Sequence, residues 1–176
     1  MPSGRMSPPR SNLPAIRAAI LTVSTSVSRR ENEDLSGPKL AAAAEEAGCE
    51  VVGMEVVPDD FGLIEDRLHH FVAQGCDLIF TTGGTGLTPN DVTPEATRSV
   101  IQREAPGFSE TMRAEGLKHT PLGILTRGVS GIAHRTLIVN FPGSPKAIDQ
   151  LFGVLTPTLE HVVQTLRGDS SHHGHR

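Results

Sequence analysis

Short apolar runs alternate with stretches of helical periodicity along the first half of the chain, and this alternation constrains the fold more than any other feature. The apolar runs of strand length cover residues 18–23, 50–57 and 78–80. Between them, residues 36–48 are rich in alanine and residues 61–72 place apolar side chains at helical spacing, so both stretches are predicted to be helices. The order βαβαβ is typical of a parallel sheet with right-handed crossovers. We therefore predict an α/β fold of three layers, αβα, with helices on both faces of a mostly parallel sheet.

The second half of the chain is less regular. It predicts helices over 94–104 and 108–115, the second of them ended by Gly116. Glycine-punctuated strands are predicted around 122–132, a buried strand over 137–140 and a last helix over 148–166. Pro157 is expected to kink that last helix, because proline lacks the backbone N–H that a helix interior requires.

The length of 176 residues suits one domain of ordinary size. We expect a single domain over residues 17–167, without an internal repeat or a second domain. The segment 1–16 is rich in Pro, Ser, Gly and Arg, and the segment 168–176 is rich in Ser, Gly and His, both without apolar periodicity. Both are therefore expected to be disordered tails.

Composition excludes several classes of function. Sixteen Lys and Arg against twenty Asp and Glu give a net charge of −4, which is the wrong sign for a protein that binds nucleic acid through its phosphates. No stretch approaches the roughly 20 apolar residues of a membrane span, and the N-terminus lacks the apolar core of a signal peptide, so a cytoplasmic protein is expected. Cys49 and Cys76 alone form neither a disulfide framework nor a zinc site, and we expect both to be buried.

Polar, glycine-rich turns follow four of the predicted strands. In an open parallel α/β sheet, ligands bind beyond the carboxyl ends of the strands. The turns at those ends cover residues 24–34, 58–60, 81–93 and 141–146. The functional site is therefore predicted at this edge of the sheet.

The turn after the third strand carries the strongest motif, TTGGTG, with Thr82, Gly83, Gly84, Thr85 and Gly86 as its candidate binding residues. Glycines let backbone N–H groups approach an anion closely and threonine hydroxyls add donors, so the motif predicts a phosphate cradle. Its spacing matches neither a P-loop nor the dinucleotide-binding fingerprint. The alternative is a tight turn without a ligand, because glycine-rich turns between strand and helix are common.

Asp59 and Asp91 follow the second and third strands. Mg²⁺ is usually held by one or two carboxylates together with phosphate oxygens and waters, so the pair predicts a Mg²⁺-nucleotide site in which both residues are catalytic and metal-binding. Alternatively, Asp91 only complements the positive end of a helix that begins with Thr93 as N-cap and Pro94 as first residue. Asp60 is expected to cap its own helix, which favours Asp59 as ligand or base.

The turn after the fourth strand repeats the order of strand, glycine turn and helix. Its candidate substrate-binding residues are Pro142, Gly143, Ser144, Pro145 and Lys146. The turn is either a second anion site, in which the lysine meets a phosphate, or a structural turn with a surface lysine.

The turn after the first strand adds four candidate binding residues, Ser24, Asp34, Ser36 and Gly37. The last three open the first helix. They either bind a polar group or form an ordinary helix cap.

The segments AAILTVS, DLSGPKL, VVPDD, LIFTTGGTGLTPNDVTPEAT and LIVNFPGSPKA together resemble the MogA/MoaB family of molybdenum-cofactor biosynthesis, which includes the G domains of gephyrin and its plant counterpart. The resemblance spans residues 17–166. It implies the molybdenum-cofactor-biosynthesis fold, a homotrimer, and ATP and molybdopterin as substrates with Mg²⁺ as cofactor.

The adenylyltransferase branch of this family transfers AMP from Mg-ATP to the terminal phosphate of molybdopterin, giving adenylyl-molybdopterin and pyrophosphate. The resemblance implies this activity here, with Asp59 and Asp91 on the family's acidic motifs, and a downstream molybdenum-insertion protein as partner. Two other functions remain open: a non-catalytic molybdopterin-binding or scaffolding protein, and a nucleotide hydrolase that uses the same cradle.

The chain departs from the family at one position. The family commonly reads Ser-Asp after the first strand, whereas this chain has Ser24 and Thr25. A carboxylate often present near the site is therefore missing, which favours the scaffolding alternative, whereas Asp59, Asp91 and the segment DVTPEAT favour the enzyme.

Overall fold

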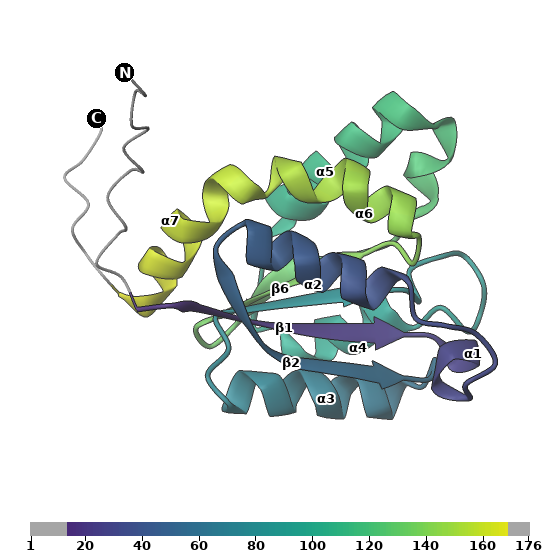
Figure 1. Cartoon of the computed structure of the whole chain (residues 1–176), viewed down its shortest axis with the longest axis horizontal. Coiled ribbons are helices and arrows are strands. Elements are labelled where there is room, and N and C mark those ends of the chain that lie inside the picture. The colour runs from purple at the N-terminus through teal and green to yellow at the C-terminus, as the bar shows by residue number, and fades with distance from the viewer. Residues whose placement is uncertain (1–13, 169–176) are drawn as a thin grey trace, which may run out of the picture.

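The computed structural model describes residues 14–168 and contains one six-stranded sheet with the order β2-β1-β3-β6-β5-β4 (Figure 1). Only β5 runs antiparallel to its neighbours. The strands are β1 (Ile16–Val23), β2 (Cys49–Val57), β3 (Leu78–Thr82), β4 (Arg103–Glu104), β5 (Ser130–Ala133) and β6 (Thr136–Phe141). The predicted mostly parallel sheet is confirmed.

Helices cover both faces of the sheet, so the predicted three-layer arrangement is also confirmed (Figure 1). One face carries α2 (Ser36–Glu46), α5 (Pro106–His119), α6 (Pro145–Leu151) and α7 (Thr156–Arg167), and the other carries α3 (Phe61–Ala73) and α4 (Thr93–Val100). Three short helices complete the described chain: α1 (Thr25–Ser28), η1 (Pro121–Leu125) and η2 (Phe152–Val154).

The core consists of two apolar layers, one on each side of the sheet. Successive strand residues point to opposite faces, so Ala18 and Ile20 of β1 pack toward α2 while Ala19 and Leu21 pack toward α3. All residues of β3 and β6 are buried, as expected for strands covered on both faces. Cys49 and Cys76 are buried as well, and burial raises the pKa of the Cys49 thiol to about 11.

The strand order creates a crevice at one edge of the sheet. From β1 the chain crosses to β2 on one side, and from β2 it crosses back to β3 on the other side of β1. The turns that leave β1 and β3 therefore diverge, and such a switch point is where open α/β sheets bind ligands.

The predicted helix over 94–104 is too long. The structure ends α4 at Val100, and β4 pairs with β5 at the edge of the sheet. Gly131 of β5 permits this pairing, because an added Cβ there would lie 2.8 Å from the carbonyl oxygen of Arg103. A close approach between two strands overrides the local helical pattern.

The predicted helix over 108–115 is too short, because Gly116 does not end it. The helix α5 runs from Pro106 to His119, and Gly116 is buried within it. An added Cβ on Gly123 of η1 would lie 2.8 Å from the carbonyl carbon of Gly116. The two glycines therefore let α5 and η1 pack closely, and this contact is tertiary rather than a helix stop.

Two further predictions about the second half need correction. The predicted strands around 122–132 are a 3₁₀ helix at η1 followed by only four strand residues in β5. The predicted last helix is two helices, α6 and α7, joined by η2. Pro157 lies in the first turn of α7, where the missing N–H costs no helical hydrogen bond. It marks a helix start rather than a kink.

The ends of the described chain adjust the expected domain limits slightly. The strand β1 begins at Ile16, within the segment expected to be an N-terminal tail, and α7 ends at Arg167 with Gly168 in a left-handed conformation. The remainder of both expected tails, 1–13 and 169–176, lies outside the described residues. Among residues 14–168, no helix has both the length and the apolar character needed to cross a bilayer.

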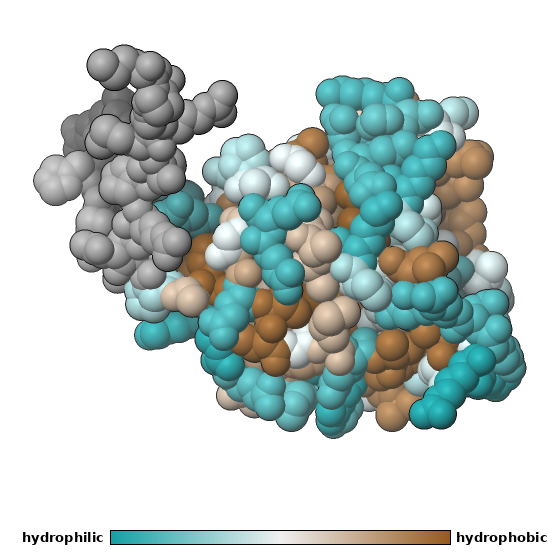
Figure 2. All heavy atoms as spheres, in the orientation of Figure 1, coloured by the Kyte–Doolittle hydropathy of each residue, from teal (hydrophilic) through white to brown (hydrophobic). Residues whose placement is uncertain are grey.

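Hydrophobic residues also reach the surface, in separate patches on the face shown in Figure 2. Among the exposed large apolar side chains are Met54 and Val56 of β2, which are 48% and 39% exposed. The strand β2 is at the edge of the sheet.

Candidate active site

Two glycines with left-handed backbones bring the TTGGTG turn against the end of β1. Gly83 has φ +95 and Gly84 has φ +67, a region that side chains rarely adopt. A Cβ on Gly83 would collide with the carbonyl oxygen of Val23, and a Cβ on Gly84 would collide with Thr93 Oγ1. The turn therefore requires glycine at both positions.

Threonine hydroxyls anchor this turn to its neighbours. Thr82 Oγ1 donates to the carbonyl oxygen of Pro142 at 2.8 Å, and Thr93 Oγ1 donates to that of Gly83 at 2.9 Å. The prediction that Thr93 caps its helix is wrong, because its hydroxyl holds the glycine turn and the N-cap is Val92, which makes no side-chain capping bond. Pro94 is the second residue of α4 rather than the first, and still lies in its first turn.

Asp59 lies just beyond the end of β2 and is fixed by the turn that follows β1. Its Oδ2 accepts hydrogen bonds from the backbone N–H of Thr25 at 3.1 Å and from Thr25 Oγ1 at 2.8 Å. The backbone N–H of Asp59 donates to Thr25 Oγ1 at 3.0 Å. The other oxygen, Oδ1, faces the glycine turn, because an added Cβ on Gly84 would lie 3.3 Å from it. Asp60 caps α3 through Leu63 N–H, as predicted.

Asp91 is held in a similar way by its own loop. Its Oδ2 accepts from the backbone N–H of Thr88 at 3.0 Å and from Thr88 Oγ1 at 2.7 Å. An added Cβ on Gly86 would lie 2.8 Å from the same oxygen. Asp91 thus lies against the far end of the glycine turn.

Both aspartates line one cavity of about 400 Å³ at the switch point. Most of the predicted binding residues from the first, second and third turns line it as well: Ser24, Asp34, Ser36, Thr82, Gly83 and Gly84. Gly143 and Pro145 from the fourth turn complete the predicted part of its wall. Residues from turns far apart in the sequence are therefore brought together as the strand-end rule requires.

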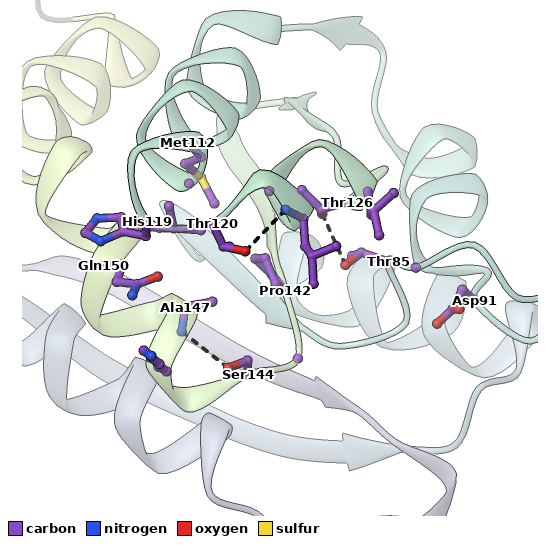
Figure 3. Close-up of a pocket in the computed structure, with 18 of the residues that line it drawn as sticks. Thr85, Asp91, Met112, His119, Thr120, Thr126, Pro142, Ser144, Ala147 and Gln150 are labelled. Carbon is purple, nitrogen blue, oxygen red and sulfur yellow. Dashed lines mark hydrogen bonds between the residues drawn. The ribbon is translucent and has the colours of Figure 1, made fainter.

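A second cavity, of about 600 Å³, lies on the other side of the glycine turn. It contains the remaining predicted residues of the third and fourth turns, Thr85, Gly86, Pro142, Ser144 and Lys146. The two cavities share Gly84, Asp91 and Gly143. Figure 3 shows Asp91 at one end of the larger cavity, with His119 and Gln150 at the other.

The rest of the larger cavity's wall was not predicted from the sequence. It comes from α5, η1 and α6, which contribute Met112, His119, Thr120, Leu122 and Gln150 among others. None of these follows a parallel strand, so the strand-end rule does not reach them. The close packing of α5 against η1 at Gly116 and Gly123 forms this wall, and the sequence carries no local signal for it beyond the two glycines.

The predicted cluster at the start of α2 is held within the fold. Asp34 Oδ1 accepts from Gly37 N–H at 2.9 Å, and Asp34 Oδ2 accepts from Thr22 Oγ1 at 2.9 Å. Asp34 rather than Ser36 therefore supplies the hydrogen bond at this helix start. Gly37 lines neither cavity, and an added Cβ on it would collide with Asp34 and Thr22. These contacts favour the helix-cap interpretation for Asp34 and Gly37.

Ser24 and Ser144 both cap helices at the edge of a cavity. Ser24 Oγ accepts from Val27 N–H at 3.3 Å, and Ser144 Oγ accepts from Ala147 N–H at 3.4 Å. Both residues also line a cavity.

The donor set fits a metal that arrives with a nucleotide. Within residues 14–168 no group of three or more His, Cys, Asp and Glu side chains could enclose an ion. Two carboxylates at one cavity, with one oxygen of Asp59 directed at the glycine turn, suit Mg²⁺, which takes its other ligands from phosphates and water.

Comparison with known families gives a match over most of the chain. The model of a family described as a probable molybdopterin binding domain matches residues 19–161. The matched region contains every strand except the start of β1 and includes both aspartates.

Individual proteins and structures agree with this match. The molybdopterin adenylyltransferase of Helicobacter pylori strain J99 is 38% identical over 157 residues, which is 88% of this chain and 89% of that protein. The molybdenum cofactor synthesis protein cinnamon of Drosophila melanogaster is 38% identical over 160 residues, which is 89% of this chain but only 26% of that protein. The molybdopterin biosynthesis enzyme MoaB of Thermus thermophilus has a TM-score of 0.82 at 42% identity, with 87% of this chain and 97% of that chain covered.

Proposed function

The chain belongs to the probable molybdopterin binding domain family, and we propose that it is a molybdopterin adenylyltransferase of molybdenum-cofactor biosynthesis. In the proposed reaction a terminal phosphate oxygen of molybdopterin attacks the α-phosphorus of ATP. A new P–O bond forms, the bond between the α-phosphorus and the bridging oxygen breaks, and pyrophosphate leaves with the electron pair. The relatives that are named for this activity and match over most of their length support the proposal.

One observation of the structure carries the proposal. Asp59 and Asp91 meet the glycine turn at a cavity whose wall, through Gly84, Asp91 and Gly143, is shared with a second cavity. A reaction between two large substrates needs two adjoining sites that meet at the reacting phosphate. The shared wall supplies that junction.

The chain's residues would act mainly by positioning and by electrostatics. Phosphoryl-type transfers gain most of their rate when nucleophile and phosphorus are held in line and the developing charge is stabilised. The N–H groups of Gly84, Thr85 and Gly86 would hold phosphate oxygens, whereas that of Gly83 donates to the carbonyl oxygen of Phe141. Lys146 would add a positive charge from the larger cavity. This site requires no activated side-chain nucleophile.

Mg²⁺ belongs to the proposal as a cofactor brought by ATP. Asp59 and Asp91 are the residues that would hold it, and the ion would neutralise phosphate charge. Thr25 and Thr88 each clamp one aspartate, because the backbone N–H and the hydroxyl of the threonine both donate to Oδ2 of that aspartate. Oδ1 of each aspartate takes no part in these hydrogen bonds.

The second candidate function is a non-catalytic molybdopterin-binding or scaffolding protein. The observation that favours it is Thr25, which stands where the family commonly has an aspartate. In this structure Thr25 is not an inert replacement, because it makes three hydrogen bonds with Asp59. It leaves the site with one carboxylate fewer than the family pattern.

The test is an assay of the purified chain with molybdopterin and Mg-ATP, in which adenylyl-molybdopterin and pyrophosphate are both quantified. Formation of the two products in equal amounts is the expected result. Binding of molybdopterin without turnover would instead establish the scaffolding function. A parallel reaction without molybdopterin measures ATP hydrolysis, and hydrolysis at the full rate there would identify a nucleotide hydrolase.

A homotrimer, a cytoplasmic location and delivery of the product to a molybdenum-insertion protein complete the proposal. They rest on the family resemblance. Sedimentation equilibrium of the purified chain tests the trimer, because a mass near 18.7 kDa would identify a monomer.

A further inference from the structure

Arg127 makes an unusual set of contacts with the loop that carries Asp91. Its Nε donates to the carbonyl oxygen of Gly86 at 2.8 Å, and its Nη2 donates to that of Asp91 at 2.7 Å. Its backbone N–H donates to the carbonyl oxygen of Thr85 at 2.8 Å. Its Nη1 lies 2.5 Å from Oε1 of Glu95 in α4. One residue thus contacts the start of the loop, its end and the helix that follows.

The loop needs such an anchor because it lies outside regular secondary structure. Residues 83–92 lie between β3 and α4 in neither helix nor strand. Within the loop, Asp91 N–H bonds to the carbonyl oxygen of Thr88, and the Thr88 clamp orients the Asp91 carboxylate. These local bonds fix the shape of residues 88–91 but do not attach them to the sheet. Arg127 supplies that attachment from a segment 36 residues further along the chain.

Arg127 is outside both candidate substrate cavities. It lines a separate cavity of about 430 Å³ together with Arg98, Arg113 and residues of the segment that precedes β5. Its guanidinium approaches Asp91 through the backbone carbonyl, whereas Asp91 lines the substrate side. Any effect of Arg127 on a reaction in the substrate cavities must therefore act through the loop.

We propose that Arg127 is a positioning residue that keeps the glycine turn and Asp91 in the relative positions that the transfer reaction needs. This inference rests on the proposed function. Arginine suits the role because its planar guanidinium donates several hydrogen bonds in fixed directions, whereas lysine is a single point charge on a flexible stem. Glu95 completes the arrangement by accepting hydrogen bonds from Nη1 and, at 3.4 Å, from Nη2, while Nε and Nη2 donate to the two carbonyl oxygens.

The experiment compares Arg127→Gln and Arg127→Lys with wild type and with Arg98→Gln. Arg98 is the matched control, because it lines the same cavity but its ion pair is with the exposed Glu104, at 3.7 Å. Two quantities are measured: hydrogen exchange of the amides in residues 86–91, and kcat with KM for molybdopterin. Exchange is recorded on the free protein, so it does not depend on turnover.

Faster exchange at residues 86–91 is expected in both Arg127 variants, with unchanged exchange in β1, β3 and β6. The expected loss in kcat is on the order of 10²-fold, the scale of a misplacement by about 1 Å at a reacting centre, while KM for molybdopterin stays within about threefold. Arg98→Gln is expected to match wild type in both measurements.

Three results would overturn the inference. Wild-type exchange in the loop of Arg127→Gln would show that the contacts do not hold it. Wild-type hydrogen exchange and wild-type kcat in Arg127→Lys would show that a positive charge beside Glu95 is enough and that the directed hydrogen bonds of arginine are not needed. Equal acceleration of exchange throughout the chain would assign Arg127 to global stability. Absence of turnover in wild type would contradict the proposed function alone, because the exchange measurement still tests the loop anchor.

Discussion

Asp59 and Asp91 are held by the same pattern of hydrogen bonds, but the threonines that supply it lie at different distances along the chain. In each case one carboxylate oxygen accepts from the backbone N–H and the hydroxyl of a single threonine. The threonine that holds Asp59 is Thr25, 34 residues away, whereas Thr88 is three residues from Asp91. The backbone N–H of Asp59 also donates a hydrogen bond to Thr25 Oγ1.

The difference shows what each position depends on. The Asp59 clamp joins two turns that leave paired strands, and Ser24 N–H also bonds to the carbonyl oxygen of Val57 at 2.9 Å. Its position therefore follows from the register of β1 and β2. The Asp91 clamp lies within one loop, so that loop can shift as a unit unless Arg127 and Thr93 hold it. We expect the Asp59 side to be rigid and the Asp91 side to be adjustable.

The largest expected effect comes from removing the negative charge of Asp91. Asp91→Asn should lower kcat by at least ~100-fold, which is the scale of losing one electrostatic stabiliser, because the amide retains the shape but not the charge. Adenylyl-molybdopterin formation measures the rate, and circular dichroism with thermal unfolding checks that the fold is intact. Turnover like that of wild type would remove Asp91 from its proposed role.

The same substitution at Asp59 tests whether the two sites are equivalent. Asp59→Asn should lower kcat on the same scale if both carboxylates hold the same ion. A large loss at one position with none at the other would assign the metal to a single aspartate.

Gly84 and Gly86 provide the next comparison, because they face the two different aspartates. Gly84→Ala should lower the free energy of unfolding by at least about 1–2 kcal/mol, since φ is +67 and the added Cβ meets Thr93. In Gly86→Ala the added Cβ meets the Asp91 carboxylate, at 2.8 Å, so this variant should lower kcat while costing less stability. Urea unfolding and the product assay separate the two effects.

A matched glycine elsewhere controls for the alanine itself. An added Cβ on Gly153 of η2 meets nothing within 4 Å. Gly153→Ala should change the free energy of unfolding by no more than about 0.5 kcal/mol. A loss at Gly153 as large as that at Gly84 would contradict the argument from left-handed backbone geometry.

The strands and main helices of the first half of the fold, and most residues of the cavity at the switch point, could be predicted from the sequence. Strand-end turns are local in sequence, and the parallel sheet places them at one edge, so Asp59 and Asp91 could be predicted at a common cavity. What could not be predicted depends on tertiary contacts. Gly116 packs against η1 instead of ending a helix. Gly131 lets the edge strand β4 pair with β5, where the sequence predicted a continuation of the helix α4.

The site's supporting contacts show the same limit. The order Thr-Pro predicts that Thr93 caps a helix, but its hydroxyl donates to the carbonyl oxygen of Gly83, at the start of the same loop. Arg127 carries no motif, and its role emerges only when the loop after η1 is seen beside the Asp91 loop. Clamps formed across the fold leave no periodicity or spacing in the sequence.

Removing the hydroxyl from each clamping threonine should separate the two aspartates on a smaller scale. Thr25→Val loses two hydrogen bonds with Asp59, whereas Thr88→Val loses one in an exposed loop. With a net value of about 1 kcal/mol per hydrogen bond, Thr25→Val should be the more destabilising by about 1 kcal/mol in urea unfolding. Equal losses would mean that the long-range clamp contributes no more than the local one.

The smallest expected effect is a pH dependence confined to the Asp91 side. The hydrogen bond from Arg127 is the main cause that holds the pKa of Glu95 below its ordinary value of 4.5. A carboxyl with a lowered pKa in the folded state stabilises the fold above its ordinary pKa, and that contribution is lost as pH falls through 4.5 and then through the lowered pKa. Because the side chain of Glu95 is 44% exposed, solvent screening limits the contribution to no more than about 1 kcal/mol.

Glu95→Gln measures that contribution directly. The difference in free energy of unfolding between wild type and Glu95→Gln should be largest near neutral pH and should shrink as the pH is lowered below 4.5, because protonated glutamate resembles glutamine. Glu104→Gln, whose carboxylate meets Arg98 only at 3.7 Å, is the matched control. A difference for Glu95→Gln that stayed constant through this acid range would mean that its ion pair with Arg127 does not stabilise the fold. Arg127 would then hold the Asp91 loop through its bonds to the carbonyl oxygens of Thr85, Gly86 and Asp91 alone, and protonation of Glu95 would not loosen the loop.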